Sequence, residues 1–347
     1  MSGRHLRAEM AAQPDVLRSL VARRDEIART ARALAPDPLR GVVLVARGSS
    51  DNAALLARYL LEAYVGVPVM LAAPSLQTRY GVCPRLDGFL AVAISQSGAT
   101  PEIVSTLRLL AQGGAATLAI TNVAGSTLAE AADAAVLLEA GDEVAVPATK
   151  TFTAQVVALS LLTEALALTP PWPDDGWDIA LAAVDAALAS PESVDPLAAR
   201  LASATHVVPI GRGFLYAAAL EIGLKLAETT GVAVFGISPA DLQHGPIATI
   251  NERTHAICLN APGPVADDVG DVARALRERG ATVAAIAEDP ALVDAADLVV
   301  PIRAGVPEAL VGLAGVIRGQ QLALATAEAR GIDPDTPFSL SKVTPTT

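Results

Sequence analysis

The chain contains the same stretch twice, and this duplication constrains its fold more than any other feature. Residues 42–48 (VVLVARG) and 207–213 (VVPIGRG) are short apolar runs that both end in Arg-Gly. The same offset pairs 91–95 with 256–260 without a gap. A register that stays constant over about 75 positions indicates a duplicated structural unit. The sequence therefore predicts two similar lobes, and differences between the copies mark the lobe that carries chemistry.

Short β-rich runs alternate with helical runs in both copies, at a spacing typical of parallel βαβ units. A chain of 347 residues is long enough for two domains of about 150 residues each. We expect an α/β fold in which each copy forms a parallel sheet flanked by helices, a flavodoxin-like three-layer sandwich. The expected strands are 42–46, 67–71, 89–94, 116–121, 135–139, 206–210, 232–235, 254–259, 281–286 and 298–302. The expected helices are one or two over 9–35, then 51–65, 101–112, 126–132, an amphipathic helix over 153–168, 177–189, 215–230, 266–279 and 308–330.

Pro-rich and aperiodic stretches divide the chain. Residues 169–176 (TPPWPDDG) interrupt the alternation and indicate a linker. The last residues show no hydrophobic period and indicate an extended arm. We expect a helical lead over 1–36, a first domain over 37–170, a linker with a bridging helix over 171–194, a second domain over 195–330 and a C-terminal tail over 331–347.

Composition and charge argue against several classes of protein. A net charge of -12 disfavours nucleic acid and anionic membrane as partners. No run of about 18 uncharged apolar residues indicates a membrane span, and the first residues lack the apolar core of a secretory signal. Cys83 and Cys258 lie in aliphatic segments, so we predict buried free thiols in a cytoplasmic protein. The four histidines lack the spacing of a metal site, and we expect no metal.

A loop rich in hydroxyl groups follows the expected strand 89–94. It reads Ser95-Gln96-Ser97-Gly98-Ala99-Thr100, and Pro101-Glu102 then opens a helix. Thr100 suits the N-cap, Gly98 allows a ligand to approach the backbone, and the free N–H groups of the helix attract an anion. Together with the hydroxyls and the Gln96 amide, they predict a site for a phosphate monoester. A well-capped turn between strand and helix is the alternative.

The second copy keeps this turn but loses its hydroxyl groups. At the same offset it reads Asn260-Ala-Pro-Gly-Pro-Val265, and Gly48-Ser49-Ser50 corresponds to Gly213-Phe214-Leu215. A turn with only a structural role has no need of the hydroxyls, as the second copy demonstrates. We therefore predict that the first lobe binds phosphate, with Ser49 and Ser50 on a second loop beside the first.

Other polar residues are ambiguous by pattern alone. Glu221, Lys225 and Glu228 share one face of an expected helix, which most often marks a solvated stripe of ion pairs. His244 lies in a loop with Gly and Pro, where an isolated histidine is usually incidental. Lys342 lies in the tail, where a lysine is usually solvated.

Five motifs taken together resemble the isomerase half of glucosamine-6-phosphate synthase, which consists of two sugar isomerase (SIS) domains in tandem. They occur in family order, and the resemblance covers the chain from about residue 40 to its C-terminus. The motifs are 95–100 (SQSGAT), 147–155 (PATKTFTAQ), 220–228 (LEIGLKLAE), 242–246 (LQHGP) and 340–342 (LSK). The resemblance implies two tandem SIS domains.

The resemblance also implies a role for each matching residue. Glu228 matches the carboxylate that moves a proton between C1 and C2 of the sugar, and Lys225 matches a lysine of the same site. His244 matches a histidine that assists ring opening and is contributed by the neighbouring subunit, which implies a homodimer. Lys342 matches the tail lysine that can form a Schiff base with the open sugar. The residues matched to binding of the 6-phosphate are Ser50, Ser95, Gln96, Ser97 and Thr100, with Ser49 beside them.

The tail has a pattern of its own. Phe338, Leu340 and Lys342 alternate along it, which predicts one packed face that turns Lys342 inward. The prolines of 334 and 337 stiffen this arm and lower the entropy cost of docking it.

Residues expected around the sugar depart from the family. Ala99 replaces an acidic residue, Ala148 replaces a serine and Gln243 replaces a lysine. Arg47 stands where the synthase has a small residue. No glutaminase segment with an N-terminal cysteine precedes the match, so we expect no built-in source of ammonia.

We expect a cytoplasmic enzyme that acts on a hexosamine or hexose 6-phosphate without a metal or organic cofactor, because the substrate's own carbonyl acidifies the adjacent C–H. The favoured reaction converts glucosamine 6-phosphate to fructose 6-phosphate and ammonia, since without channelled ammonia the C2–N bond is more readily broken than made. Three alternatives stay open. They are dehydration of an N-acetylhexosamine 6-phosphate, synthase-type isomerisation with free ammonia, and a sugar-phosphate-binding regulator without activity.

Overall fold

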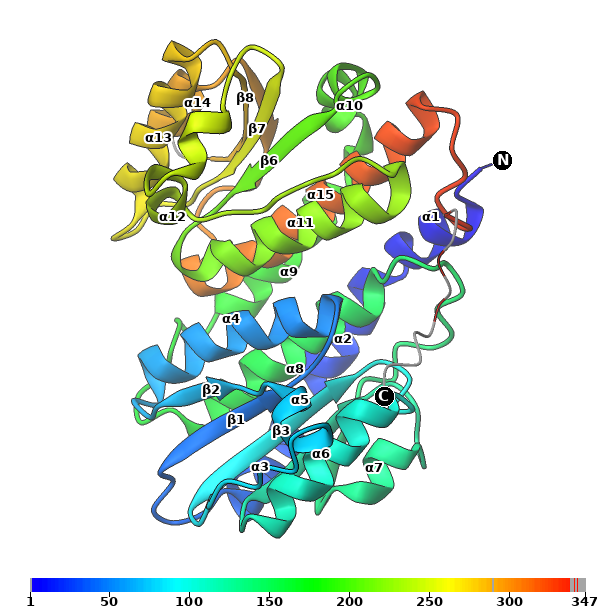
Figure 1. Cartoon of the computed structure of the whole chain (residues 1–347), viewed down its shortest axis with the longest axis vertical. Helices are drawn as coiled ribbons and strands as arrows, with labels where there is room; N and C mark the ends of the chain where they lie inside the picture. The colour runs from blue at the N-terminus through cyan, green and yellow to red at the C-terminus, as the bar shows by residue number, and fades with distance from the viewer. Residues whose placement is uncertain (1, 289, 338–339, 341, 343–347) are drawn as a thin grey trace. The chain divides into compact units, whose positions relative to one another are not determined.

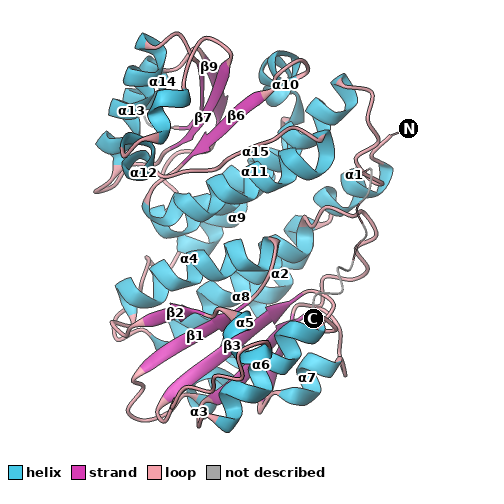
Figure 2. Cartoon of the chain, in the orientation of Figure 1, coloured by secondary structure: helices cyan, strands magenta, loops and turns pink. Residues whose placement is uncertain are grey.

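The computed structural model describes residues 2–288, 290–337, 340 and 342, and it divides into two compact units. The N-lobe comprises 15–143 and 150–171 together with Lys342. The C-lobe comprises the opening residues to 14, the loop 144–149 and residues from 172 to 340. Each lobe has its own parallel sheet, coloured magenta in Figure 2. The expected α/β class with two helix-flanked parallel sheets is therefore confirmed.

The N-lobe sheet has five parallel strands in the order β2-β1-β3-β4-β5 (Figure 1). The chain moves from β1 outward to β2 and then returns to the other side of β1, so the order reverses between β1 and β3. Such a topological switch point is where doubly wound folds place their ligands. The strands are β1 (Gly41–Val45), β2 (Val69–Leu71), β3 (Phe89–Ser95), β4 (Ala116–Thr121) and β5 (Ala134–Leu137).

Helices cover both faces of this sheet, which is why β1 and β3 are buried along nearly their whole length and read as continuous apolar runs. One layer contains α3 (Arg24–Leu34), α4 (Ser49–Tyr64) and α8 (Lys150–Leu166), after α2 (Gln13–Ala22). The other contains α5 (Pro74–Thr78), α6 (Pro101–Gln112) and α7 (Thr127–Ala131). α8 starts earlier than expected and is buried along most of its length, so the prediction of an amphipathic helix was wrong.

The C-lobe repeats the plan with four parallel strands in the order β6-β7-β8-β9. The strands are β6 (His206–Ile210), β7 (Thr254–Leu259), β8 (Thr282–Ala287) and β9 (Leu298–Pro301). One layer contains α12 (Pro239–Gln243), α13 (Ala266–Glu278) and α14 (Pro290–Ala295). The other contains α9 (Gly176–Ala189), α10 (Asp195–Leu201), α11 (Tyr216–Thr230) and α15 (Glu308–Ala329), and α1 (Arg4–Ala11) packs on α15. Three short 3-10 helices complete the lobe: η1 (Pro191–Val194), η2 (Gly213–Leu215) and η3 (Pro246–Thr249).

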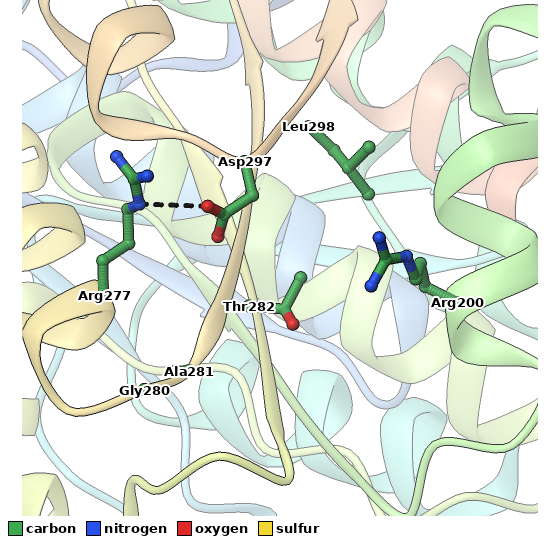
Figure 3. Close-up of a pocket in the computed structure, with 7 residues that line it drawn as sticks. All are labelled: Arg200, Arg277, Gly280, Ala281, Thr282, Asp297 and Leu298. Carbon is green, nitrogen blue, oxygen red and sulfur yellow. Dashed lines mark ion pairs between the residues drawn. The ribbon is translucent and has the colours of Figure 1, made fainter.

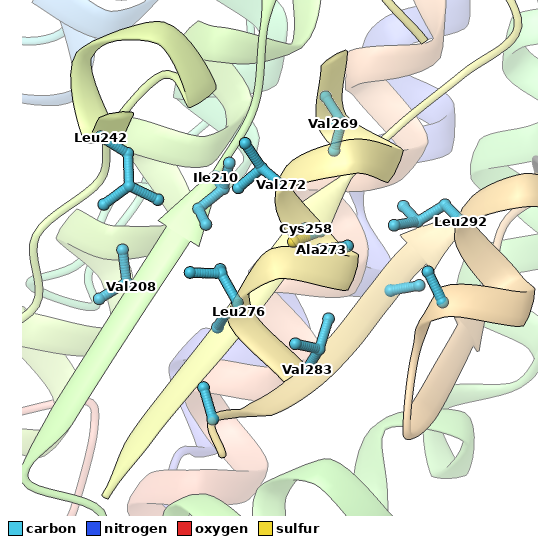
Figure 4. Close-up of a cluster of buried hydrophobic side chains, with 14 of the residues drawn as sticks. Val208, Ile210, Leu242, Cys258, Val269, Val272, Ala273, Leu276, Val283 and Leu292 are labelled. Atoms are coloured by element: carbon cyan, nitrogen blue, oxygen red, sulfur yellow. The ribbon is translucent and has the colours of Figure 1, made fainter. Parts of the chain in front are cut away.

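Aliphatic side chains join the C-lobe sheet to α13 (Figure 4). Val208, Cys258 and Val283 come from three neighbouring strands and pack against Val272 and Leu276 of the helix. Among the described residues, this layer consists of small and branched side chains together with Cys258.

Three features differ from expectation. The segment 232–235 forms only one isolated bridge to β6, at Val234, and a second bridge follows the segment at Ile237. The region 9–35 forms three helices rather than one or two, because Pro14 lacks the N–H that a continuous helix needs and α1 ends before it. Cys258 is buried, and burial raises its pKa to about 12. Cys83 is exposed, since it lies in the loop before β3 rather than in an aliphatic element.

Among the described residues, one helix, α15, has the length and composition of a membrane span. The apolar window of this helix is 94% buried inside the fold, as is usual for the central helix of a globular lobe. This feature is therefore weak evidence for a membrane.

The first helix is joined to the last part of the C-lobe. The backbone N–H groups of His5 and Leu6 donate to the Asp335 carboxylate at 2.9 and 2.8 Å, across some 330 positions of the chain. A carboxylate there satisfies free N–H groups and complements the helix dipole. At the other end of α1, Glu9 accepts hydrogen bonds from the N–H groups of Val144 and Ala145. α1 therefore holds the start of the tail and the loop 144–149 within one lobe.

Candidate functional site

Two helices begin next to each other at the carboxyl edge of the N-lobe sheet. β1 and β3 are hydrogen-bonded neighbours, with Val45 opposite Ala93, so the loops that follow them leave the same edge. α4 begins at Ser49, directly after one loop, and α6 begins at Pro101, directly after the other. The first turn of each helix offers N–H groups suited to an anion. The structure therefore brings the two predicted phosphate loops together at the switch point.

The serine loop of residues 95–100 has a fixed conformation. Gly98 has φ +60°, and a Cβ there would lie 2.1 Å from Ser126 Oγ, so only glycine fits. The glycine is thus explained by packing inside the lobe rather than by the approach of a ligand. Thr100 occupies the N-cap of α6, but its hydroxyl makes no capping hydrogen bond. This observation weakens the alternative of a turn built only for capping, because the hydroxyl is not used for it.

Charged residues tie the two loops together. Arg47 Nε lies 3.1 Å from a carboxylate oxygen of Glu102, which joins the loop after β1 to the first turn of α6. Burial raises the pKa of Asp51, and the charge of Arg47 partly opposes that rise. The arginine that departs from the family therefore has a role in this structure. It fixes the two helix starts that flank the switch point.

The corresponding edge of the C-lobe is filled by its own side chains. Arg212 pairs with Asp268 at 3.0 Å, and the Asn260 amide donates to the Ala266 carbonyl at 3.0 Å. A Cβ at Gly263 would lie 2.4 Å from the Glu308 carboxylate, whose pKa is raised by burial. Acidic groups at this edge would repel a phosphate. The contrast between the copies therefore extends beyond their hydroxyl groups.

Ser97→Ala and Thr100→Val should each raise KM for a phosphorylated sugar about 10- to 100-fold, the effect of losing a hydrogen bond to a charged group. Thermal unfolding should change little, because the Thr100 hydroxyl makes no capping bond and the Ser97 hydroxyl accepts only one exposed hydrogen bond, from the Ala99 N–H at 3.3 Å. The control is Asn260→Ala, which should lower stability through its lost bond to Ala266 and leave KM unchanged. Steady-state kinetics and calorimetry give both quantities, and equal KM effects in the two copies would contradict the asymmetry.

A buried group of three charges lies on α11. Lys225 Nζ lies 2.5 Å from Glu228 and 3.5 Å from Glu221. The Lys225 and Glu221 side chains are 2% and 0% exposed, whereas Glu228 is 23% exposed. Such burial contradicts a solvated stripe, because unpaired charges at these positions would be costly. Glu228 is the member whose carboxylate solvent or a substrate can reach.

His244 lies apart from that group, at the end of α12. It is exposed, and its backbone N–H donates to Asp241 while Gly245 follows with φ +132°. Within the described part of the chain, the His244 ring makes no hydrogen bond or ion pair. An exposed imidazole on a sharp turn is compatible with a role outside its own lobe.

Lys342 is docked on the N-lobe. Its Nζ lies 2.9 Å from Glu143 Oε2, and the Lys342 side chain is 22% exposed. Phe338 lies outside the described residues, and Leu340 is 48% exposed, so the packed face predicted for the tail is not seen. An ion pair with Glu143 holds Lys342 against the N-lobe.

Lysine is rare in this chain. Of its 25 lysine and arginine residues, only three are lysines: Lys150, Lys225 and Lys342. Lys150 and Lys225 are buried, and Lys342 is paired with a buried carboxylate. The sequence contained this signal, because lysine and arginine are not interchangeable and only lysine can supply a neutral amine. Sequence reasoning missed it, and it also missed Glu143.

A separate polar pocket of about 410 Å³ opens at the amino ends of β8 and β9 (Figure 3). Arg277 and Asp297 neutralise each other there at 3.1 Å, and Arg200 faces them from α10. This pocket lies at the opposite edge of its sheet from Asn260. In the part of the chain that the structure describes, no cluster of His, Cys, Asp and Glu could hold a metal ion.

Two similar lobes, each with a parallel sheet between layers of helices, define a duplicated α/β protein. The SIS domain model matches residues 40–165 and 200–328, and the chain belongs to the SIS domain family. It is 31% identical over 336 residues to the glutamine–fructose-6-phosphate aminotransferase [isomerizing] of Methanothermobacter thermautotrophicus. That match covers 96% of this chain and 56% of the relative, so the chain spans about half the length of that protein.

Two solved structures have the same fold over almost the whole chain. One is the C-terminal domain of glucosamine-fructose-6-phosphate aminotransferase from Francisella tularensis, with a TM-score of 0.84 and 26% identity. It covers 96% of this chain and 98% of that one. The other is a candidate phosphosugar isomerase from Silicibacter pomeroyi, with a TM-score of 0.84 and 30% identity, covering 96% and 100%. The predicted resemblance to the isomerase half is confirmed.

Proposed function

We propose that this protein isomerises an amino-sugar 6-phosphate and releases its nitrogen, converting glucosamine 6-phosphate and water to fructose 6-phosphate and ammonia. The observation that carries the proposal is the buried charge group of α11, in which Lys225 orients the accessible Glu228 carboxylate. A protein that only binds a sugar phosphate has no need of such a proton acceptor. The isomerase type of the related proteins supports the same reaction class.

Each step uses a group with suitable chemistry. The serine loop and the starts of α4 and α6 hold the phosphate through hydroxyl and N–H donors. His244 assists opening of the pyranose ring. Glu228 then takes the proton from C2 and returns it to C1, which leaves an imine at C2. The Lys342 amine adds to the C2 imine and displaces ammonia, and water then hydrolyses the resulting Schiff base, which forms the C2 carbonyl and releases the lysine.

The direction follows from what attacks the imine. The matched relative is named for a glutamine-dependent amination, but this chain spans only about half of it, so that whole activity is not carried over. Water greatly outnumbers free ammonia in solution, so the C2 imine is hydrolysed more readily than it is formed. We therefore propose deamination, with synthase-type use of free ammonia as the reverse reaction.

A direct assay separates the alternatives. The protein is incubated with glucosamine 6-phosphate, and ammonia and fructose 6-phosphate are measured together. A parallel incubation with N-acetylglucosamine 6-phosphate is examined for an unsaturated product, which would indicate dehydration instead. Tight binding of either sugar without any product would support a regulator and contradict an enzyme.

If His244 serves the site of a neighbouring subunit, two inactive variants should restore each other. His244→Ala mixed with Glu228→Gln should regain activity after subunit exchange, because one site of a two-fold heterodimer is then wild type. Mixing each variant with itself is the control. An absence of recovery, with exchange verified by mass, would place His244 in the site of its own subunit or outside it. The homodimer and the cytoplasmic location stay predictions.

A further inference from the structure

Glu143 is a buried carboxylate to which the proposed function gives no role. Its side chain is 0% exposed. It accepts hydrogen bonds from the Thr151 backbone N–H at 3.1 Å and from the Thr151 hydroxyl at 2.6 Å, and Lys342 Nζ lies 2.9 Å away. A carboxylate buried this deeply is costly unless its oxygens are satisfied. Thr151 at the start of α8 and the tail lysine, 199 positions away, satisfy them together.

The loop that carries Glu143 is joined to the serine loop. Asn122, directly after β4, accepts from the Ala140 N–H at 2.8 Å and donates through its amide to the Gly141 carbonyl at 2.8 Å. The Asn122 backbone N–H donates to the Gln96 carbonyl at 3.0 Å. One asparagine therefore fixes the Glu143 loop against the loop that is proposed to bind phosphate. Both loops lie at the carboxyl edge of the N-lobe sheet.

The cation that Glu143 binds is one of only three lysines. An arginine would make a stronger paired contact with a carboxylate, but its guanidinium stays charged and cannot act as a nucleophile. Lysine at this position indicates that the amine does more than hold the tail. A Schiff base requires that this amine be placed next to the bound sugar.

We propose that Glu143 is a positioning residue, which docks the C-terminal tail by binding the Lys342 ammonium and holds that amine at the edge carrying the serine loop. The amine chemistry rests on the proposed function, whereas the docking does not. Asn122 sets the distance between the docking carboxylate and the phosphate loop. The serine loop thus binds the phosphate of the sugar, and the loop that carries Glu143 places the Lys342 amine next to the sugar.

Trypsin tests the docking without any sugar. Cleavage after Lys342 removes the five terminal residues and changes the intact mass. A lysine engaged by Glu143 cannot enter the protease, so Glu143→Gln should accelerate this cleavage about 10- to 100-fold, the effect of losing a charge-assisted bond. Asp142→Asn is the matched control, since it removes the same charge from the exposed neighbouring position and should leave the cleavage rate unchanged. Cleavage of Glu143→Gln at the wild-type rate would overturn the proposal.

Kinetics separates positioning from general support of the fold. Glu143→Gln should lower kcat and leave KM for the sugar phosphate unchanged, because the serine loop is intact. In a Lys342→Met background the same change should have no further effect on kcat. A rise in KM in both backgrounds would mean that Glu143 only supports the loop, and an unchanged kcat would mean that the docked amine has no part in turnover. Both results contradict the proposal.

Two further outcomes distinguish a failure of the docking from a failure of the proposed function. If trypsin cleavage depends on Glu143 but no sugar phosphate is turned over, the docking stands and the proposed function fails. Thr151→Val is a milder variant for the case in which Glu143→Gln does not fold. It removes one hydrogen bond to Glu143 and should accelerate cleavage to a smaller extent. Unchanged cleavage in Thr151→Val together with an unfolded Glu143→Gln would count against the docking.

Discussion

Glu228→Gln should lower kcat for glucosamine 6-phosphate by about 10²- to 10⁴-fold, the usual scale for a lost general base. Glutamine has the shape of glutamate but cannot accept the C2 proton. Lys225 keeps Glu221 as a partner at 3.5 Å, so the change does not leave a buried ammonium unpaired. Phosphate affinity should stay unchanged because the serine loop is untouched. Steady-state kinetics measures kcat and KM, and deuterium exchange at C2 measures the proton transfer itself.

Glu278→Gln is the control for charge. Glu278 is exposed on α13 of the same lobe, and the variant should retain full kcat. Full turnover by Glu228→Gln would remove the proton-transfer role and leave the group on α11 as a structural ion pair. Exchange of the C2 proton that persists in Glu228→Gln would likewise contradict a proton-transfer role for Glu228.

Lys342→Met and Lys342→Arg should both lose turnover by about 10³-fold or more, the scale of removing a nucleophile that forms a covalent intermediate. Arginine keeps the charge that Glu143 binds but cannot form a Schiff base. A low rate in both variants, while trypsin cleaves the tail of Lys342→Arg as slowly as that of the wild type, would separate chemistry from docking; Lys342→Met has no trypsin site in the tail and serves only the kinetics. Trypsin and intact mass report the state of the tail.

Borohydride reduction in the presence of fructose 6-phosphate identifies the amine directly. The wild-type protein should gain the mass of one reduced sugar, and peptide mapping should place it on Lys342. Lys150 and Lys225 are internal controls, being 7% and 2% exposed. Labelling of either one instead, or full activity in Lys342→Arg, would contradict a Schiff base at the tail.

Much of the fold could be read from local pattern. The duplicated apolar runs predicted the strands of both sheets, because strands buried on both faces require continuous aliphatic residues. The order of the loops then placed Ser49 and Thr100 on neighbouring strand ends. The segment 232–235 was predicted as a strand because pattern reports β propensity, but the backbone there meets β6 only at one isolated bridge.

What pattern did not reveal depends on contacts between distant residues. Glu221 looks like a surface residue of an amphipathic helix, and only tertiary packing buries it. Glu143 and Lys342 meet across 199 positions, and no local period encodes that pair. Gly98 is explained by Ser126, a side chain from another loop. The resemblance to a known family identified Lys342, but the residue that holds it came from the structure.

The contacts of α1 bear on the order in which the chain is completed. Most of the N-lobe is a nearly continuous segment, whereas the C-lobe combines the first fourteen residues with the last part of the chain. During synthesis from the N-terminus, α1 emerges some 330 residues before its capping carboxylate at Asp335. Domains generally form as soon as their residues are available. This helix must therefore wait until both lobes have been synthesised, and the segment that leads to Lys342 is held by an anchor that forms only after Asp335 has emerged.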